Sequence, residues 1–70
     1  MRLEDFEIGC LYSYKHDKNY GGIYLCLDLF VDKLDRKNAK MLDIKNNKIF
    51  ESPLFANYYF YLPLPTTEEQ

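Results

Sequence analysis

The sequence contains no tryptophan, one histidine, two cysteines, three glycines and three prolines among its 70 residues. The lone His16 and the two cysteines have no zinc-binding spacing, so the sequence predicts no metal site. It also lacks a glycine-rich phosphate loop and the common hydrolase motifs, which predicts no bound cofactor, no catalytic residue and no enzyme activity. No apolar run approaches the roughly 20 residues that span a bilayer, so we expect no membrane association.

Neither positive nor negative charge clearly predominates in the sequence. Nine basic and eleven acidic residues give a formal net charge of −2, and the basic residues are scattered except for Arg36, Lys37 and Lys40. This argues against non-specific nucleic-acid binding, which depends on clustered Lys and Arg. The first nine residues are partly acidic and form no apolar leader, so we expect a cytoplasmic protein.

Aromatic residues are abundant by contrast, with seven tyrosines and five phenylalanines. Because each ring buries about 150–250 Å², they can supply a compact core without a metal or disulfide. We therefore expect one small domain over residues 1–65 and an acidic, disordered tail over residues 66–70. Phe, Tyr, Met, Ile, Asn and Lys, which have AT-rich codons, make up 30 of the 70 residues, and this is typical of many phages, plasmids and low-GC bacteria.

The segment Ile8–Leu29 predicts two strands around a polar turn, with Leu11 opposite Leu25 and Cys10 opposite Cys26. In the cytoplasm both cysteines are expected to be reduced and to fill space, although the pairing would permit a disulfide on oxidation.

Side-chain alternation divides these two strands into an aliphatic face and a tyrosine face. We expect the aliphatic face to form the core, and it comprises Leu11, Ile23, Leu25, Leu27 and Leu29. We expect the tyrosine face to be the functional surface, and it comprises Cys10, Tyr12, Tyr14, Tyr24 and Cys26. The alternative is that the tyrosines simply cover the second side of a thin barrel.

The segment Ile23–Val31 has the clearest strand pattern, with apolar residues at every odd position over nine residues. A helical stripe that includes Leu27, Phe30 and Leu34 competes with it. The polar residues after Leu34 interrupt that stripe for a full turn, which favours a strand followed by a turn.

The segment Lys40–Phe50 predicts a hairpin with Asn46-Asn47 in a two-residue turn, which pairs Ile44 with Ile49 and Asp43 with Phe50. Leu42, Ile44 and Ile49 are then expected in the core, with Met41 and Phe50 on the other face. Towards the C-terminus we expect a short 3-10 turn over Leu54–Asn57 and a last strand over Tyr58–Leu62.

These elements predict an all-β fold of five short strands with a 3-10 turn before the last strand. Leu11-Tyr12-Ser13-Tyr14 resembles the Ala-Leu-Tyr-Asp-Tyr strand of Src-homology-3 domains, and Leu54–Tyr59 resembles their closing Pro-Ser-Asn-Tyr-Val segment. The resemblance implies a small five-stranded barrel in which Tyr12, Tyr14 and Tyr58 line a groove for proline-rich peptides. The sequence departs from that family in having no tryptophan for the groove.

The leading functional hypothesis is a small, non-catalytic protein-interaction module, because tyrosine gives contact area at low entropy cost. The predicted partner-binding residues are Tyr12, Tyr14, Tyr24, Phe50, Tyr58, Tyr59 and Tyr61. Such a module is either a peptide-groove domain or an acidic inhibitor or adaptor, phage-encoded and acting on a larger host protein. The alternatives are a homo-oligomer and a small barrel that binds nucleic acid through exposed aromatics.

Overall fold

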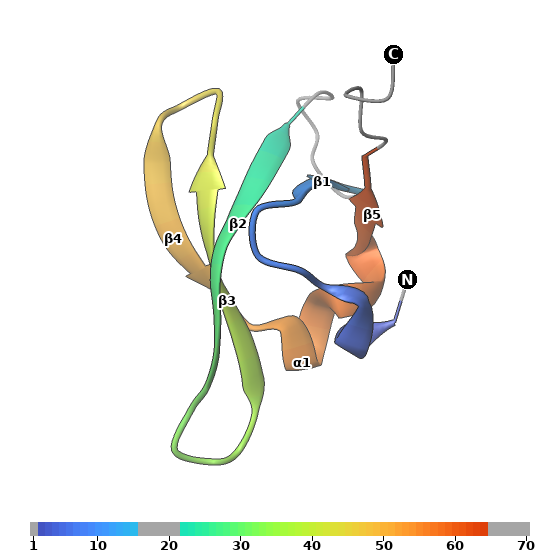
Figure 1. Cartoon of the computed structure of the whole chain (residues 1–70), viewed down its shortest axis with the longest axis vertical. Coiled ribbons are helices and arrows are strands. Elements are labelled where there is room, and N and C mark those ends of the chain that lie inside the picture. The colour runs from blue at the N-terminus through green and yellow to red at the C-terminus, as the bar shows by residue number, and fades with distance from the viewer. Residues whose placement is uncertain (1, 16–21, 65–70) are drawn as a thin grey trace.

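The computed structural model describes residues 2–15 and 22–64, which form five antiparallel strands with short helical segments (Figure 1). The strands are β1 (Leu11–Tyr14), β2 (Ile23–Val31), β3 (Lys37–Asp43), β4 (Lys48–Ser52) and β5 (Tyr61–Pro63). The helical segments are η1 (Leu3–Asp5), α1 (Leu54–Asn57) and η2 (Tyr58–Phe60). The prediction of a mostly-β fold with five strands is therefore confirmed.

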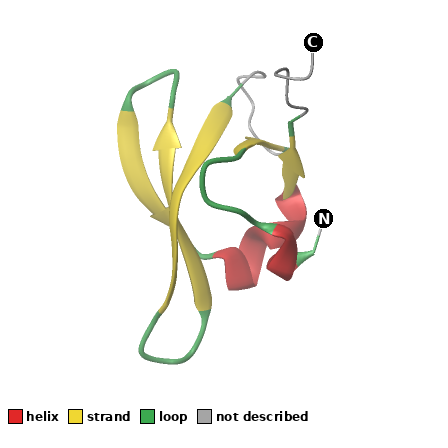
Figure 2. Ribbon diagram, in the orientation of Figure 1, coloured by secondary structure: helices red, strands yellow, loops and turns green. Residues whose placement is uncertain are grey.

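The strands form one sheet in the order β4-β3-β2-β1-β5, so β4 and β5 are its edges. The sheet is not closed into a barrel by backbone pairing among the described residues. The helical segments gather on one side of it (Figure 2). The loop between β1 and β2, and the tail predicted over 66–70, lie outside the described residues.

The pairing of β1 with β2 confirms the register that alternation predicted. Leu11 is opposite Leu25 and Tyr12 is opposite Tyr24. Directly before β1, the carbonyl oxygen of Cys10 accepts a hydrogen bond from the backbone N–H of Cys26 at 3.0 Å. Cross-strand pairs of β-prone side chains therefore fixed this part of the sheet.

The expected burial of the two faces is wrong, because the core lies on the tyrosine face. The buried apolar residues are Phe6, Tyr12, Cys26, Ala39, Met41, Leu54 and Tyr61. Leu11, on the aliphatic face, is 38% exposed, whereas Tyr12 is 2% exposed. The reason is non-local: Phe6 before β1 and Leu54 in α1 pack on the tyrosine face and cover it.

A β-bulge in β2 reverses the inward-facing positions along that strand. Cys26 pairs with Met41 but Asp28 pairs with Lys40, which leaves Leu27 as the additional residue. Even-numbered residues face the core before the bulge, and Leu29 packs against the core after it. The expectation of a core position is therefore confirmed for Leu29.

The chain between β2 and β3 forms a turn, which excludes the competing helix over this segment. One carboxylate organises the turn, since Asp32 accepts hydrogen bonds from the backbone N–H groups of Leu34 and Arg36 and from the Asn38 side chain. Arg36 Nε also contacts the Asp32 carboxylate at 2.9 Å, and Asp35 adopts a left-handed conformation with φ of 62°. Although partial desolvation opposes it, these bonds lower the pKa of Asp32.

The β3–β4 hairpin exists, but its predicted register is wrong. Asp43 pairs with Lys48 rather than with Phe50, which gives a longer loop. The Asp43 carboxylate accepts hydrogen bonds from the backbone and side-chain nitrogens of Asn46 at 3.3 and 2.9 Å. Of the two asparagines in the loop, Asn47 alone takes a left-handed conformation (φ 55°). An aspartate that binds its own loop thus replaces the expected two-residue turn.

The predicted faces of this hairpin are also wrong. Met41 is fully buried, whereas Ile44 and Ile49 are exposed and Leu42 is half-buried. Phe50 lies on the same side of the sheet as Met41, next to Tyr24. The two-residue change in register preserves side-chain parity, so this error follows from the face assignment and not from the turn.

The last strand begins later than expected. Leu54–Asn57 forms a helical turn that continues into a 3-10 turn, because the backbone N–H of Tyr58 donates to the Leu54 carbonyl. The predicted strand over Tyr58–Leu62 is therefore wrong for its first three residues, and β5 starts at Tyr61. Pro63 can stand in β5 because an edge strand tolerates a missing N–H.

Candidate protein-interaction site

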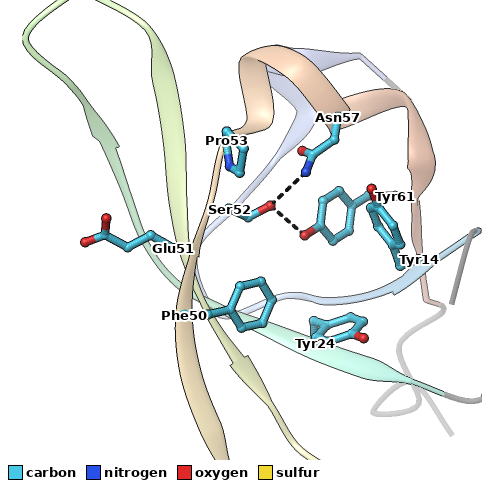
Figure 3. Close-up of a pocket in the computed structure, with 8 residues that line it drawn as sticks. All are labelled: Tyr14, Tyr24, Phe50, Glu51, Ser52, Pro53, Asn57 and Tyr61. Atoms are coloured by element: carbon cyan, nitrogen blue, oxygen red, sulfur yellow. Dashed lines mark hydrogen bonds between the residues drawn. The ribbon is translucent and has the colours of Figure 1, made fainter.

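A pocket of about 290 Å³ lies between the two edge strands of the sheet (Figure 3). Its lining residues are Tyr14, Tyr24, Phe50, Glu51, Ser52, Pro53, Asn57 and Tyr61. Four of the seven predicted partner-binding residues meet here, namely Tyr14, Tyr24, Phe50 and Tyr61. We call this cavity the seam pocket, since it occupies the seam between β4 and β5.

The seam exists because the sheet curls. Four gaps of about 4.8 Å would hold the edges of a flat five-stranded sheet about 19 Å apart. In this protein the hydroxyl oxygens of Ser52 on β4 and Tyr61 on β5 are 2.7 Å apart, within hydrogen-bond distance. The two edges therefore meet through side chains at one end of the seam.

The Ser52–Tyr61 contact lies at the polar end of the pocket (Figure 3). Both residues are 2% exposed, and Asn57 Nδ2 donates to Ser52 Oγ at 3.3 Å. Burial raises the pKa of the Tyr61 phenol, and its hydrogen bond to Ser52 offsets this only in part. Asn57 Oδ1 is buried and accepts no hydrogen bond from the described residues.

Aromatic rings form the remaining walls. The Tyr24 ring meets Phe50 edge-on at 5.7 Å between centroids and Tyr61 at 6.5 Å. Tyr14 packs against Tyr61 at 4.8 Å. Glu51 is the one ionisable carboxylate of the lining, and its side chain points away from the cavity (Figure 3). The pocket can therefore hold an uncharged, apolar group.

The other three predicted residues lie elsewhere. Tyr12 belongs to the core, where it packs on Phe6 at 5.0 Å and its hydroxyl accepts a hydrogen bond from the Glu7 backbone N–H at 2.9 Å. Burial raises the pKa of Tyr12. Tyr58 and Tyr59 are on η2, where their rings contact one another at 5.4 Å. Tyr12 is thus inaccessible to a partner, which corrects its placement on an exposed face.

The face expected to be the core is a second candidate surface. One row of aliphatic side chains crosses four strands, in the order Leu11, Leu25, Leu42 and Ile49. Ile49 is 63% exposed, and Leu25 and Leu42 are half-buried. We call this row, with Ile23 beside it, the outer aliphatic face.

The cysteines and acidic residues form no further centre. Cys26 is buried, which raises the pKa of its thiol, and Cys10 is half-buried; both are free thiols. Within residues 2–15 and 22–64, no group of His, Cys, Asp and Glu side chains could hold a metal ion. No helix in that part of the chain is long and apolar enough to cross a membrane.

Comparison with known proteins gives no relative. No protein-family model matches the chain, and no curated protein or solved structure matches it either. The candidate site therefore rests on the geometry alone.

Sequence reasoning missed three lining residues of the seam pocket, which are Ser52, Pro53 and Asn57. In the sequence, Ser52-Pro53 predicts only the end of a strand, since Pro cannot donate to the ladder. What brings these residues to Tyr61 is the tight helical connection of α1 and η2, and no local pattern in the sequence encodes the resulting contact.

Proposed function

We propose that this protein is a non-catalytic protein-interaction module that takes an apolar side chain of a partner protein into the seam pocket. The observation that carries the proposal is the pocket itself, which has aromatic walls, a buried polar end and no charged group pointing inward. Concave, mostly apolar sites with a few polar groups are typical of ligand recognition.

The size of the pocket supports a side chain as its occupant. At about 290 Å³ it lies at the lower limit of sites for small molecules, which measure about 300–1,000 Å³. The adjacent β4 is an edge strand, and its residues from Lys48 to Glu51 are exposed. An extended segment of the partner could pair with this edge and direct one side chain into the pocket.

Two finer features belong to the same proposal. The contact between Ser52 and Tyr61 across the seam supports a relationship to the small five-stranded Src-homology-3-like barrel, in an incompletely closed form. The net charge of −2 supports the acidic inhibitor or adaptor form, and the high content of residues with AT-rich codons supports a phage as its source, acting in the host cytoplasm.

The test uses single amino acids as probes. Full burial of one apolar side chain contributes about 1.5–3 kcal/mol, which corresponds to a dissociation constant of about 6–80 mM. We therefore expect the N-acetyl amides of leucine and phenylalanine, titrated to that range, to shift the backbone amide NMR signals of Phe50, Ser52 and Asn57. The N-acetyl amide of lysine should not shift them.

Two neighbouring residues of β4 supply a matched pair of variants. Phe50→Ser removes a wall of the pocket, whereas Ile49→Ser changes the opposite face of the same strand. We expect Phe50→Ser to abolish the shifts and Ile49→Ser to retain them. Equal shifts in both variants, or shifts confined to other residues, would refute binding in the seam pocket.

A further inference from the structure

The outer aliphatic face has a feature that the seam pocket does not explain, which is a row of alternating charges along its border. Asp28 pairs with Lys40, and Lys40 pairs with Glu51, so the row crosses β2, β3 and β4 with signs minus, plus, minus. All three side chains are exposed. Lys40 is two residues from Leu42 and Glu51 is two residues from Ile49, so the charges share the face of the aliphatic row.

The described helical segments do not cover this face. Phe6, Leu54 and the half-buried Tyr58 all pack against the core on the opposite side of the sheet. Domains are usually built from two packed layers, and a sheet with an apolar face packs well on another sheet about 10 Å away.

We propose that a second copy of this chain covers the outer aliphatic face, by packing the two sheets face to face around a two-fold axis. The axis would run parallel to the strands, between β2 and β3. It then places Leu25 over Leu42 of the second copy and Leu11 over its Ile49, and each contact occurs twice.

The charge row selects this position of the axis. With the axis between β2 and β3, Asp28 of each copy lies over Lys40 of the other. An axis on β3 would instead place Lys40 over Lys40 and Asp28 over Glu51, and an axis on β2 would place Asp28 over Asp28. Only the first arrangement combines opposite charges with full overlap of the four-residue aliphatic row.

The size of the face sets the strength of the association. Four strands spaced by about 4.8 Å, over about five residues of each strand, give a face roughly 19 Å wide and 17 Å long. That flat area, about 320 Å², is less than half of the ~800 Å² that each partner contributes to a standard interface. The dimer should therefore be weak and concentration-dependent.

The test is sedimentation equilibrium of the full chain between about 10 µM and about 1 mM, a range in which a weak dimer associates. We expect the weight-average mass to rise towards twice the monomer mass. Lys40→Glu and Asp28→Lys should each weaken dimerisation about tenfold or more, because like charges then face one another across the axis. The double variant, Asp28→Lys with Lys40→Glu, should restore it.

Two further variants test whether the dimer forms through the outer aliphatic face. Ile49→Lys changes a residue that is 63% exposed, so the monomer should fold, as circular dichroism can verify, while dimerisation is lost. Phe50→Ser, on the inner face, should leave dimerisation unchanged, which separates this proposal from binding in the seam pocket. A monomer at every concentration, or a dimer that tolerates both single charge reversals, would overturn the proposal and leave the face to a different protein.

Discussion

Leu11 and Tyr12 are adjacent in β1 and point to opposite faces, so alanine substitution at each tests which face is the core. Tyr12 is 2% exposed, contacts Phe6 and Tyr61, and binds the Glu7 backbone N–H. Leu11 is 38% exposed. We expect Tyr12→Ala to be far more destabilising than Leu11→Ala.

The magnitudes follow from burial. An aromatic side chain buries about 150–250 Å², which at about 25 cal/mol per Å² stabilises the fold by roughly 4–6 kcal/mol. Alanine recovers part of this, and comparable aromatic truncations cost about 3–5 kcal/mol. For Leu11→Ala we expect about 1 kcal/mol, because the side chain is partly in water and its loss leaves no closed cavity.

Those losses should be compared with the stability of a domain of this size, which is about 3.5–10 kcal/mol at 0.05–0.15 kcal/mol per residue. Tyr12→Ala should therefore be largely unfolded or melt tens of degrees lower, whereas Leu11→Ala should melt within about 8 °C of the parent. Urea and thermal unfolding, followed by circular dichroism at low micromolar concentration, would measure both. A larger loss for Leu11→Ala would refute the assignment of the core to the tyrosine face.

Two further predictions concern single polar contacts. Ser52→Ala should lower the free energy of unfolding by about 1–3 kcal/mol, because it leaves the buried Tyr61 hydroxyl without its partner. An unchanged urea midpoint would contradict this, and Ser13→Ala, at a half-buried position on β1, is the control. The pKa of Asp32 is lower in the folded than in the unfolded chain, so its contribution to stability is present above the unfolded value of about 3.9 and is lost as the pH falls through the folded value. Acid unfolding of Asp32→Asn should therefore show a shallower loss of stability over that window than the parent, and parallel curves would contradict the role of the carboxylate.

The sequence was informative where the pattern is local. The strand Ile23–Val31, the pairing of Leu11 with Leu25, and the turn after Val31 all follow from alternation and turn residues, and the structure contains each of them. These features depend on neighbours in sequence or directly across a hairpin, which is the information that a period of two carries.

The core could not be assigned in the same way, because both faces of the first hairpin are apolar enough to be buried. Leu25 and Tyr24 are equally suited to a strand, and hydropathy ranks leucine higher. Which face is buried is decided by Phe6 and Leu54, which lie outside the hairpin and pack on the tyrosine face. No pattern within the hairpin could reveal that covering layer.

The site was predictable in part for the same reason. Tyr14, Tyr24, Phe50 and Tyr61 are among the residues predicted from the sequence to bind a partner, and they do line the seam pocket. Their polar partners, Ser52 and Asn57, reach the pocket only because the chain turns sharply through α1 and η2. A contact that depends on the curl of the whole sheet has no signature in a short window of sequence.

The pairing of β1 with β5 has a consequence for the order of folding. β2, β3 and β4 are joined by short turns, so this meander can form from local contacts, and it should form early. Tyr12 finds its partner at Pro63, across almost the entire described chain. During synthesis, therefore, the first strand must wait for the last, and β1 can be paired on both edges only after the residues up to Leu64 have left the ribosome. Substitutions in β5 should accordingly change the unfolding rate more than the folding rate, which stopped-flow kinetics would measure.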